Sequence, residues 1–149
     1  MSSPPPSQAR RLSRAALWVL CGAAAYVGTW ALLAPRGFYS AFPGPGRHWI
    51  DADGPYNEHL IRDVGGLYLA LLVLTATAAR RMEPSLVRIA GLAWLVFGIP
   101  HLAYHALHLH QLGTADIALN VLSLGGIVVL AASVCVVNRP RTQTTHERP

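Results

Sequence analysis

The sequence predicts an all-α protein, an integral membrane bundle of four helices. Hydrophobic residues make up 52% of its 149 residues and charged residues only 13%, a composition that is unusual for a soluble domain of this size. Four stretches carry no charged side chain, and these are residues 15–35, 64–79, 89–99 and 117–138. A helix of about 20 apolar residues spans the hydrocarbon core of a bilayer. A soluble bundle would instead need polar faces at helical spacing, which residues 68–79 and 121–137 lack.

The membrane domain is predicted to cover residues 15–138. Its helices are expected at about residues 15–35, 55–79, 84–109 and 115–138. The first of them is longer than the apolar core of a signal peptide, so we expect a retained anchor. Pro55 and Pro84 suit the first turns of the second and third helices. The fourth is expected to begin with Thr114 as its N-cap and with Asp116 in its first turn.

The basic residues are all arginine, and they are unevenly distributed. Nine of the twelve lie in the two terminal segments or in and beside the turn between the second and third predicted helices. The positive-inside rule therefore predicts that both termini are cytoplasmic and that the chain is a multi-pass protein of the cell membrane. The formal net charge of +5 then reflects topology and contact with membrane lipids, and no nucleic-acid partner is expected.

The segments outside the helices differ in character. Residues 1–14 begin with a Ser- and Pro-rich segment and residues 139–149 are polar, so both are expected to be disordered cytoplasmic tails. The loop at 36–54 instead carries the aromatic residues Phe38, Tyr39, Phe42 and Trp49. Because aromatic side chains favour the membrane interface, we expect this loop to lie on the outer surface as a partial cap.

Histidines crowd the outer end of the third predicted helix. His101, His105 and His108 have the spacing i, i+4 and i+7, which places them on one stripe, whereas His110 points to another side. Ionisable groups at the edge of a membrane helix usually face a bundle interior, a partner or water. The stripe therefore predicts a polar pocket, although such histidines also serve simply to bond neighbouring backbone or to solvate a helix end.

The second and fourth helices bring further polar residues to the same level. Glu58 and Arg62 form an i,i+4 pair, and so do His59 and Asp63. The first pair is equally well explained as an ion pair that stabilises the end of the bundle. The predicted pocket consists of Glu58, His59, Arg62, Asp63, His101, His105, His108, Asp116 and Asn120.

Three kinds of ligand suit this residue set. Imidazole and carboxylate groups bind transition metals such as zinc or copper, and His59, Asp63, His101 and His105 form a candidate set of four ligands. A haem held by two histidines across the bundle is a second alternative. The third is a quinone or another small apolar ligand, held by Arg62 and the histidines, with protons passing through His59 and Asp63.

Motifs of hydrolases and of nucleotide-driven pumps are absent from the sequence, which contains neither Gly-x-Ser-x-Gly nor a phosphate-binding loop. We therefore expect a ligand-binding or accessory subunit. The alternative is a subunit of a membrane redox enzyme that uses a metal, a haem or a quinone. A homo-oligomer and a separate membrane partner subunit both remain open as assemblies.

The beginning of the second helix carries a family resemblance. In residues 55–70, Arg62 is followed closely by Gly65 and Gly66. With the long first loop and three closely spaced later helices, this stretch resembles small four-helix bacterial membrane proteins of the DoxX-like family. The resemblance implies a four-helix membrane fold and, for some members, a connection with membrane redox and quinone systems. The histidines of residues 101–110 are not part of the pattern.

Overall fold

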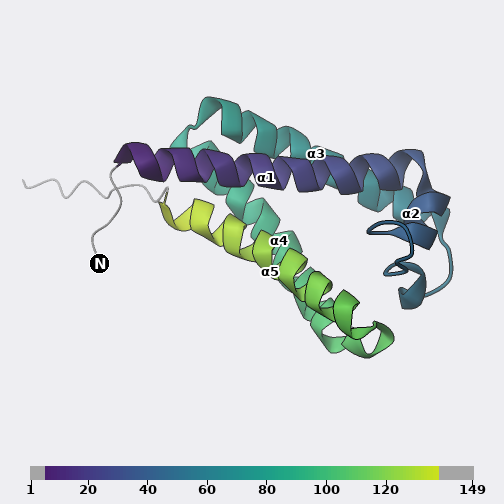
Figure 1. Ribbon diagram of the computed structural model, residues 1–149. Coiled ribbons are helices and arrows are strands. Elements are labelled where there is room, and N and C mark those ends of the chain that lie inside the picture. Colours follow the sequence, from purple (N-terminus) through teal and green to yellow (C-terminus); the bar gives the residue numbers. More distant parts are fainter. Residues whose placement is uncertain (1–5, 138–149) are drawn as a thin grey trace, which may run out of the picture.

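A computed structural model describes residues 6–137 of the chain, all of them in helices and connecting loops (Figure 1). The four long helices are α1 (Pro6–Leu33), α3 (Glu58–Arg81), α4 (Pro84–Leu107) and α5 (Thr114–Val137). The short elements are α2 (Pro35–Ala41) and the 3₁₀ turns η1 (Asp51–Asp53) and η2 (Leu109–Gln111). Each long helix has the length and hydropathy of a membrane span. The predicted all-helical membrane protein is thus confirmed at this level.

Large apolar side chains on the outer faces of the helices agree with a lipid environment. Leu67 on α3, Val96 on α4 and Leu122 on α5 are 68%, 77% and 72% exposed. A soluble monomer rarely exposes such residues along every long helix, because contiguous apolar surface promotes association in water. In a bilayer the same side chains contact acyl chains.

The first helix is longer than the sequence predicts. α1 begins at Pro6, so residues 6–14, which were expected in a disordered tail, form its first turns. Arginine, leucine, alanine and glutamine in this segment are good helix formers, and proline is tolerated at a helix start. Ser13 is already buried, which ties this part of α1 to the rest of the fold. The second predicted tail, at 139–149, lies outside the described residues.

Other boundaries shift by a few residues. α3 begins at Glu58 rather than near Pro55, because the Oδ1 atom of Asn57 accepts the backbone N–H of Leu60 at 3.1 Å and caps the helix there. Pro84 occupies the first turn of α4 and Asp116 the first turn of α5, as predicted. The loop predicted at 36–54 begins as the short helix α2, which follows directly on the end of α1.

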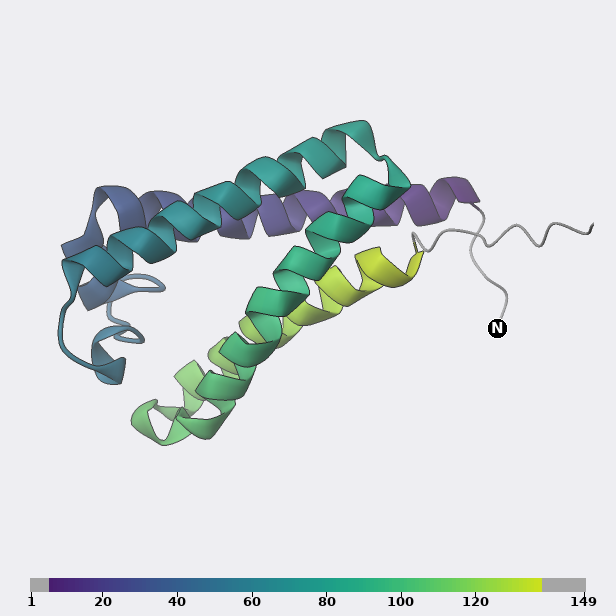
Figure 2. The same cartoon turned by 180° about the vertical axis from the view of Figure 1, so that it is seen from behind.

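The long helices form two pairs that open like a V (Figures 1 and 2). α1 lies along α3, and α4 lies along α5; the pairs meet near the α3–α4 turn and diverge toward the end that carries α2. A buried cluster with Leu17, Ala78, Val87 and Val134 joins all four helices at the closed end. At the open end, the cluster of Ala31, Phe38 and Ile61 joins only α1, α2 and α3.

Small residues and one buried hydrogen bond fix the contacts within this frame. A Cβ atom added to Gly65 of α3 would lie 2.6 Å from the backbone nitrogen of Leu32 of α1, so the two helices touch backbone to backbone there. The indole N–H of Trp94 on α4 donates to the Oγ1 atom of Thr75 on α3 at 2.8 Å, and both residues are fully buried. The first contact holds α1 against α3 within one pair, and the second joins α3 to α4 and so connects the two pairs.

Candidate functional site

A cavity of about 970 Å³ lies between the two helix pairs at their open end. Its size is typical of a site for a small molecule, which commonly occupies about 300–1,000 Å³. Every long helix and the α2–η1 loop contribute to its wall. Most of the lining side chains are aromatic or aliphatic, and examples from each side are Phe42, Ile61, Tyr68, Phe97 and Leu124.

The loop between α2 and α3 closes one side of the cavity. Phe38, Phe42 and Trp49 line the cavity, and the rings of Phe38 and Phe42 are 4.7 Å apart between centroids. The Tyr39 hydroxyl donates to the carbonyl of Gly54 at 2.8 Å and holds the loop together. The aromatic residues of the loop thus face inward, where they form part of the wall.

Asp116 anchors this loop to the second helix pair. The indole N–H of Trp49 donates to its Oδ1 atom at 2.8 Å, and the guanidinium of Arg47 pairs with the same oxygen. Trp49 is only 7% exposed. Asp116 was expected in the polar pocket, but it is not among the lining residues. Its position in the first turn of α5 places it against the loop instead, so it bridges the mouth of the V.

Polar side chains lie in the cavity wall on the α4–α5 side, among them His101, Tyr104, His105, Asn120 and Ser123. The rings of His101 and His105 are 4.7 Å apart, and His101 also stacks on Phe97 with 5.0 Å between centroids. Asn120 is 1% exposed. His101, His105 and Asn120 were predicted for the pocket, and all three line the cavity.

His108 has a different role from the one predicted. Its Nδ1 atom lies 2.7 Å from the carbonyl oxygen of Tyr104, and its ring stacks on that tyrosine at 4.2 Å. It occupies the C-cap position of α4 and does not line the cavity. The stripe is broken because α4 ends at Leu107, one residue before His108. This histidine therefore bonds the end of its own helix.

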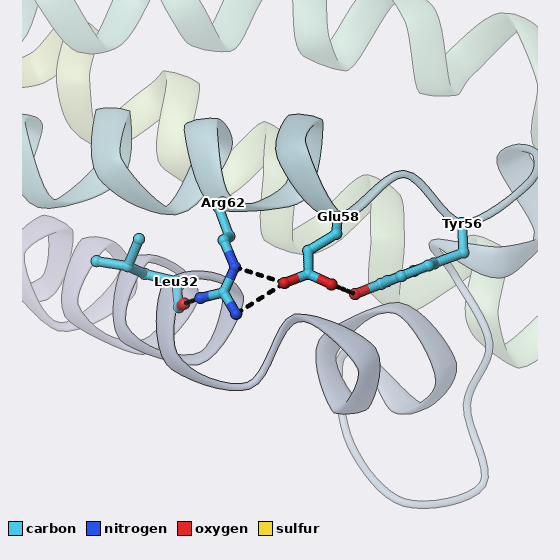
Figure 3. A network of polar contacts seen from close by, with 4 residues as sticks. All are labelled: Leu32, Tyr56, Glu58 and Arg62. Atoms are coloured by element: carbon cyan, nitrogen blue, oxygen red, sulfur yellow. Dashed lines mark hydrogen bonds and ion pairs between the residues drawn. The ribbon is translucent and has the colours of Figure 1, made fainter.

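Arg62 joins α3 to α1, as Figure 3 shows. Its Nε atom donates to Glu58 Oε1 at 3.0 Å, and its guanidinium also donates to the carbonyl of Leu32. Leu32 belongs to the last turn of α1, where carbonyl groups have no partner within the helix. Arg62 does not line the cavity. It caps α1 from the neighbouring helix, and the Glu58–Arg62 ion pair forms as predicted.

Glu58 lines the cavity, but its carboxylate is already engaged. Besides Arg62, it accepts a hydrogen bond from the Tyr56 hydroxyl at 3.1 Å (Figure 3). Desolvation, and next the bond to Glu58, raise the pKa of the Tyr56 hydroxyl, which keeps it a donor. This acid therefore contributes a paired group at the rim of the cavity.

His59 and Asp63 pair with each other on the outside of α3. Their Nε2 and Oδ2 atoms are 3.3 Å apart, with side chains 89% and 55% exposed, and neither residue lines the cavity. Between residues 6 and 137, no group of three or more His, Cys, Asp or Glu side chains is placed to hold a metal ion. The predicted ligand set of His59, Asp63, His101 and His105 is therefore wrong. The same placement removes His59 as the opposing haem ligand.

Sequence reasoning missed most of the apolar wall and the whole loop anchor. Tyr68 is buried, and its ring lies 5.2 Å from that of Phe97 between centroids. Both residues look like ordinary membrane-helix residues in the sequence. Arg47 and Trp49 carry no local signal either, because their partner Asp116 is 69 and 67 residues away.

Comparisons of the chain with protein-family models, with curated proteins and with solved structures find no match. The resemblance to the DoxX-like family therefore stays a prediction. The structure gives its residues a place: Arg62 and Gly65 both contact α1, whereas nothing lies within 4 Å of a Cβ atom added to Gly66.

Proposed function

We propose that this membrane protein binds a small, largely apolar molecule in the cavity between its two helix pairs, as a binding or accessory subunit. The observation that carries the proposal is the cavity itself, which has an apolar wall and only a few converging polar groups. Sites for small molecules generally combine these two properties. The aromatic and aliphatic side chains supply most of the contact area, and His101, His105 and Asn120 supply the polar contacts.

The loop anchor supports a binding role. Arg47 and Trp49 tie the loop to Asp116 across the mouth of the V. This bridge connects the loop that carries the aromatic residues to the second helix pair. The cavity wall thus comes from two helix pairs that the Asp116 carboxylate connects across the mouth of the V. Such a wall suits a site that admits a ligand and then retains it.

We further propose that both termini are cytoplasmic and that the cavity opens at the outer face of the cell membrane. The distribution of arginine supports this orientation, because positively charged segments are retained on the cytoplasmic side. Reporter fusions after Arg81 and within residues 40–52 test it. An externally active reporter after Arg81 would contradict the orientation.

Ligand content of the purified protein tests the binding role. We suggest extracting the full chain with its native lipids in polymer-bounded discs and identifying co-purifying molecules by mass spectrometry. Leu124→Trp fills the cavity, whereas Leu122→Trp, two residues away on the same helix, points to the exterior at 72% exposure. A molecule present in the wild type and in Leu122→Trp should be depleted in Leu124→Trp. Equal content in all three proteins would refute the proposal.

A further inference from the structure

Asn120 is a buried polar residue whose side-chain oxygen is unpaired among the described residues. It is 1% exposed and lines the cavity, and its Oδ1 atom has no hydrogen-bond partner within residues 6–137. Leaving a buried acceptor unpaired costs about 1–3 kcal/mol, so native structures rarely do so without a reason. A ligand in the cavity that donates a hydrogen bond to this oxygen would supply the partner.

The charges of the cavity wall restrict the chemistry of that ligand. In the part of the chain that the structure describes, the charged side chains lining the cavity are Asp53 and Glu58, both acidic. An anionic head would meet no arginine or lysine side chain in the described part of this wall and would lose its hydration among apolar side chains, which is costly. An ammonium head beside Asn120 would lose its hydration among apolar side chains, which is costly. A neutral hydroxyl group meets neither penalty, and the imidazoles of His101 and His105 can bond it as donors or acceptors.

A second, apolar recess shares one lining residue, Phe97, with the cavity. It has a volume of about 340 Å³ and is lined by Leu67, Ala70, Leu71, Leu74 and Phe97. Because Leu67 is 68% exposed, the recess opens toward the outer face of α3. Phe97 borders both spaces, and the other four residues lie on α3. The two spaces therefore adjoin at Phe97.

The two spaces lie at different depths along the helices. Asn120 is six residues from the start of α5, or roughly 9 Å from the open end. Leu67 and Leu74 are nine and sixteen residues from the start of α3, or roughly 14 and 24 Å from that end. Polar groups near the end of the helices and an apolar recess nearer their middle match the orientation of a lipid in one leaflet.

We infer that the ligand is a neutral amphiphile with one hydrocarbon chain: its hydroxyl-bearing head donates to Asn120, and its chain passes Phe97 into the recess on α3. This inference rests on the proposed function. An aliphatic alcohol and a phenol both have the required head group. The following experiment distinguishes between these two classes of ligand.

Photoreactive probes in nanodiscs of phosphatidylcholine test the head group. The probes share one long chain with a diazirine at its end and carry an alcohol, a phenol, a methyl ether, a carboxylate or an ammonium group. We expect saturable crosslinking within residues 67–74 by the alcohol, the phenol or both, displaced by the unlabelled compound. The methyl ether probe lacks the hydroxyl donor, so the loss of one hydrogen bond should weaken its binding up to roughly tenfold. Equal saturable crosslinking by the alcohol and the methyl ether would overturn the inference.

Variants of the recess test the chain. Ala70→Trp fills the recess, so it should weaken the binding of a hexadecanol probe and leave the binding of a hexanol probe unchanged. Val73→Trp is the matched control, since Val73 is 68% exposed on the same helix and lines neither space. The variant Asn120→Leu tests the head group instead. It should abolish the difference in crosslinking between the alcohol probe and the methyl ether probe.

The outcomes separate the two proposals. If no probe crosslinks saturably to the wild-type protein, and no molecule co-purifies with it, the proposed function itself fails. If probes crosslink saturably without regard to head group or chain length, the cavity binds ligands but the inference about their class is wrong.

Discussion

The indole N–H of Trp49 and the carboxylate of Asp116 form a hydrogen bond of 2.8 Å that connects the loop of one helix pair to the first turn of the other. Arg47 binds the same carboxylate oxygen. The mouth of the V is therefore spanned by a contact between two parts of the chain that no secondary structure holds together.

Loss of the Asp116 carboxylate should open the cavity. In a background with Cys21→Ser and Cys135→Ser, we expect Leu124→Cys to react several-fold faster with a membrane-impermeant maleimide once Asp116→Ala is added. The reason is that Arg47 and Trp49 then lose the carboxylate on α5 that ties the loop to the second helix pair. Asp63→Ala removes an acid from outside the cavity and serves as the control. Unchanged labelling would show that the loop does not depend on this anchor.

Two adjacent glycines should respond in opposite ways to alanine. Gly65→Ala places a Cβ atom 2.6 Å from the backbone of Leu32, so α1 and α3 must separate, with an expected loss of about 1–3 kcal/mol. Gly66→Ala meets nothing within 4 Å and should be neutral or stabilising by up to about 1 kcal/mol, since alanine favours helix. Unfolding measured in the same detergent compares the two. Similar behaviour of both variants would argue against the close contact.

The buried Trp94–Thr75 hydrogen bond should stabilise the closed side of the V. Thr75→Val keeps the shape but leaves the indole N–H without its acceptor, which we expect to cost about 1–3 kcal/mol of unfolding free energy. Thr77→Val is the control, because Thr77 is only partly buried and its hydroxyl bonds the carbonyl of Val73 in its own helix. Equal stability of the two variants would be the contrary result.

Arg62→Ala should destabilise the protein without emptying the cavity. The substitution removes the partner of the Leu32 carbonyl at the end of α1 and the ion pair with Glu58. We therefore expect a lower melting temperature than for His59→Ala, which removes only an exposed pair on the same helix. Ligand content should be unchanged in both. A selective loss of ligand in Arg62→Ala would assign this arginine to the binding site after all.

Sequence patterns predicted what depends on neighbouring residues of one helix. The i,i+4 pairs Glu58–Arg62 and His59–Asp63 form as expected, and so do the membrane spans, since both follow from helix geometry and hydropathy alone. His101 also reaches the cavity as predicted.

The convergence of these groups could not be read from the sequence in the same way. It depends on how each helix is rotated and on how far the pairs diverge, and neither quantity leaves a periodic signal. His59 consequently lies outside the cavity, while Trp49 and Tyr68 line it. The contacts of Arg47 and Trp49 with Asp116 were not predicted for a related reason. The sequence around a loop residue gives no indication of a partner far away in the chain.

The divergence of the helix pairs separates two tasks that compact bundles combine. Residues that hold the four helices together, such as Leu17 and Val134, lie at the closed end, whereas most of the cavity wall lies beyond them. Substitutions in that wall therefore alter the shape and polarity of the cavity, while the buried cluster that joins the helices at the closed end stays intact. Such an arrangement lets related chains diversify what they recognise on an unchanged scaffold.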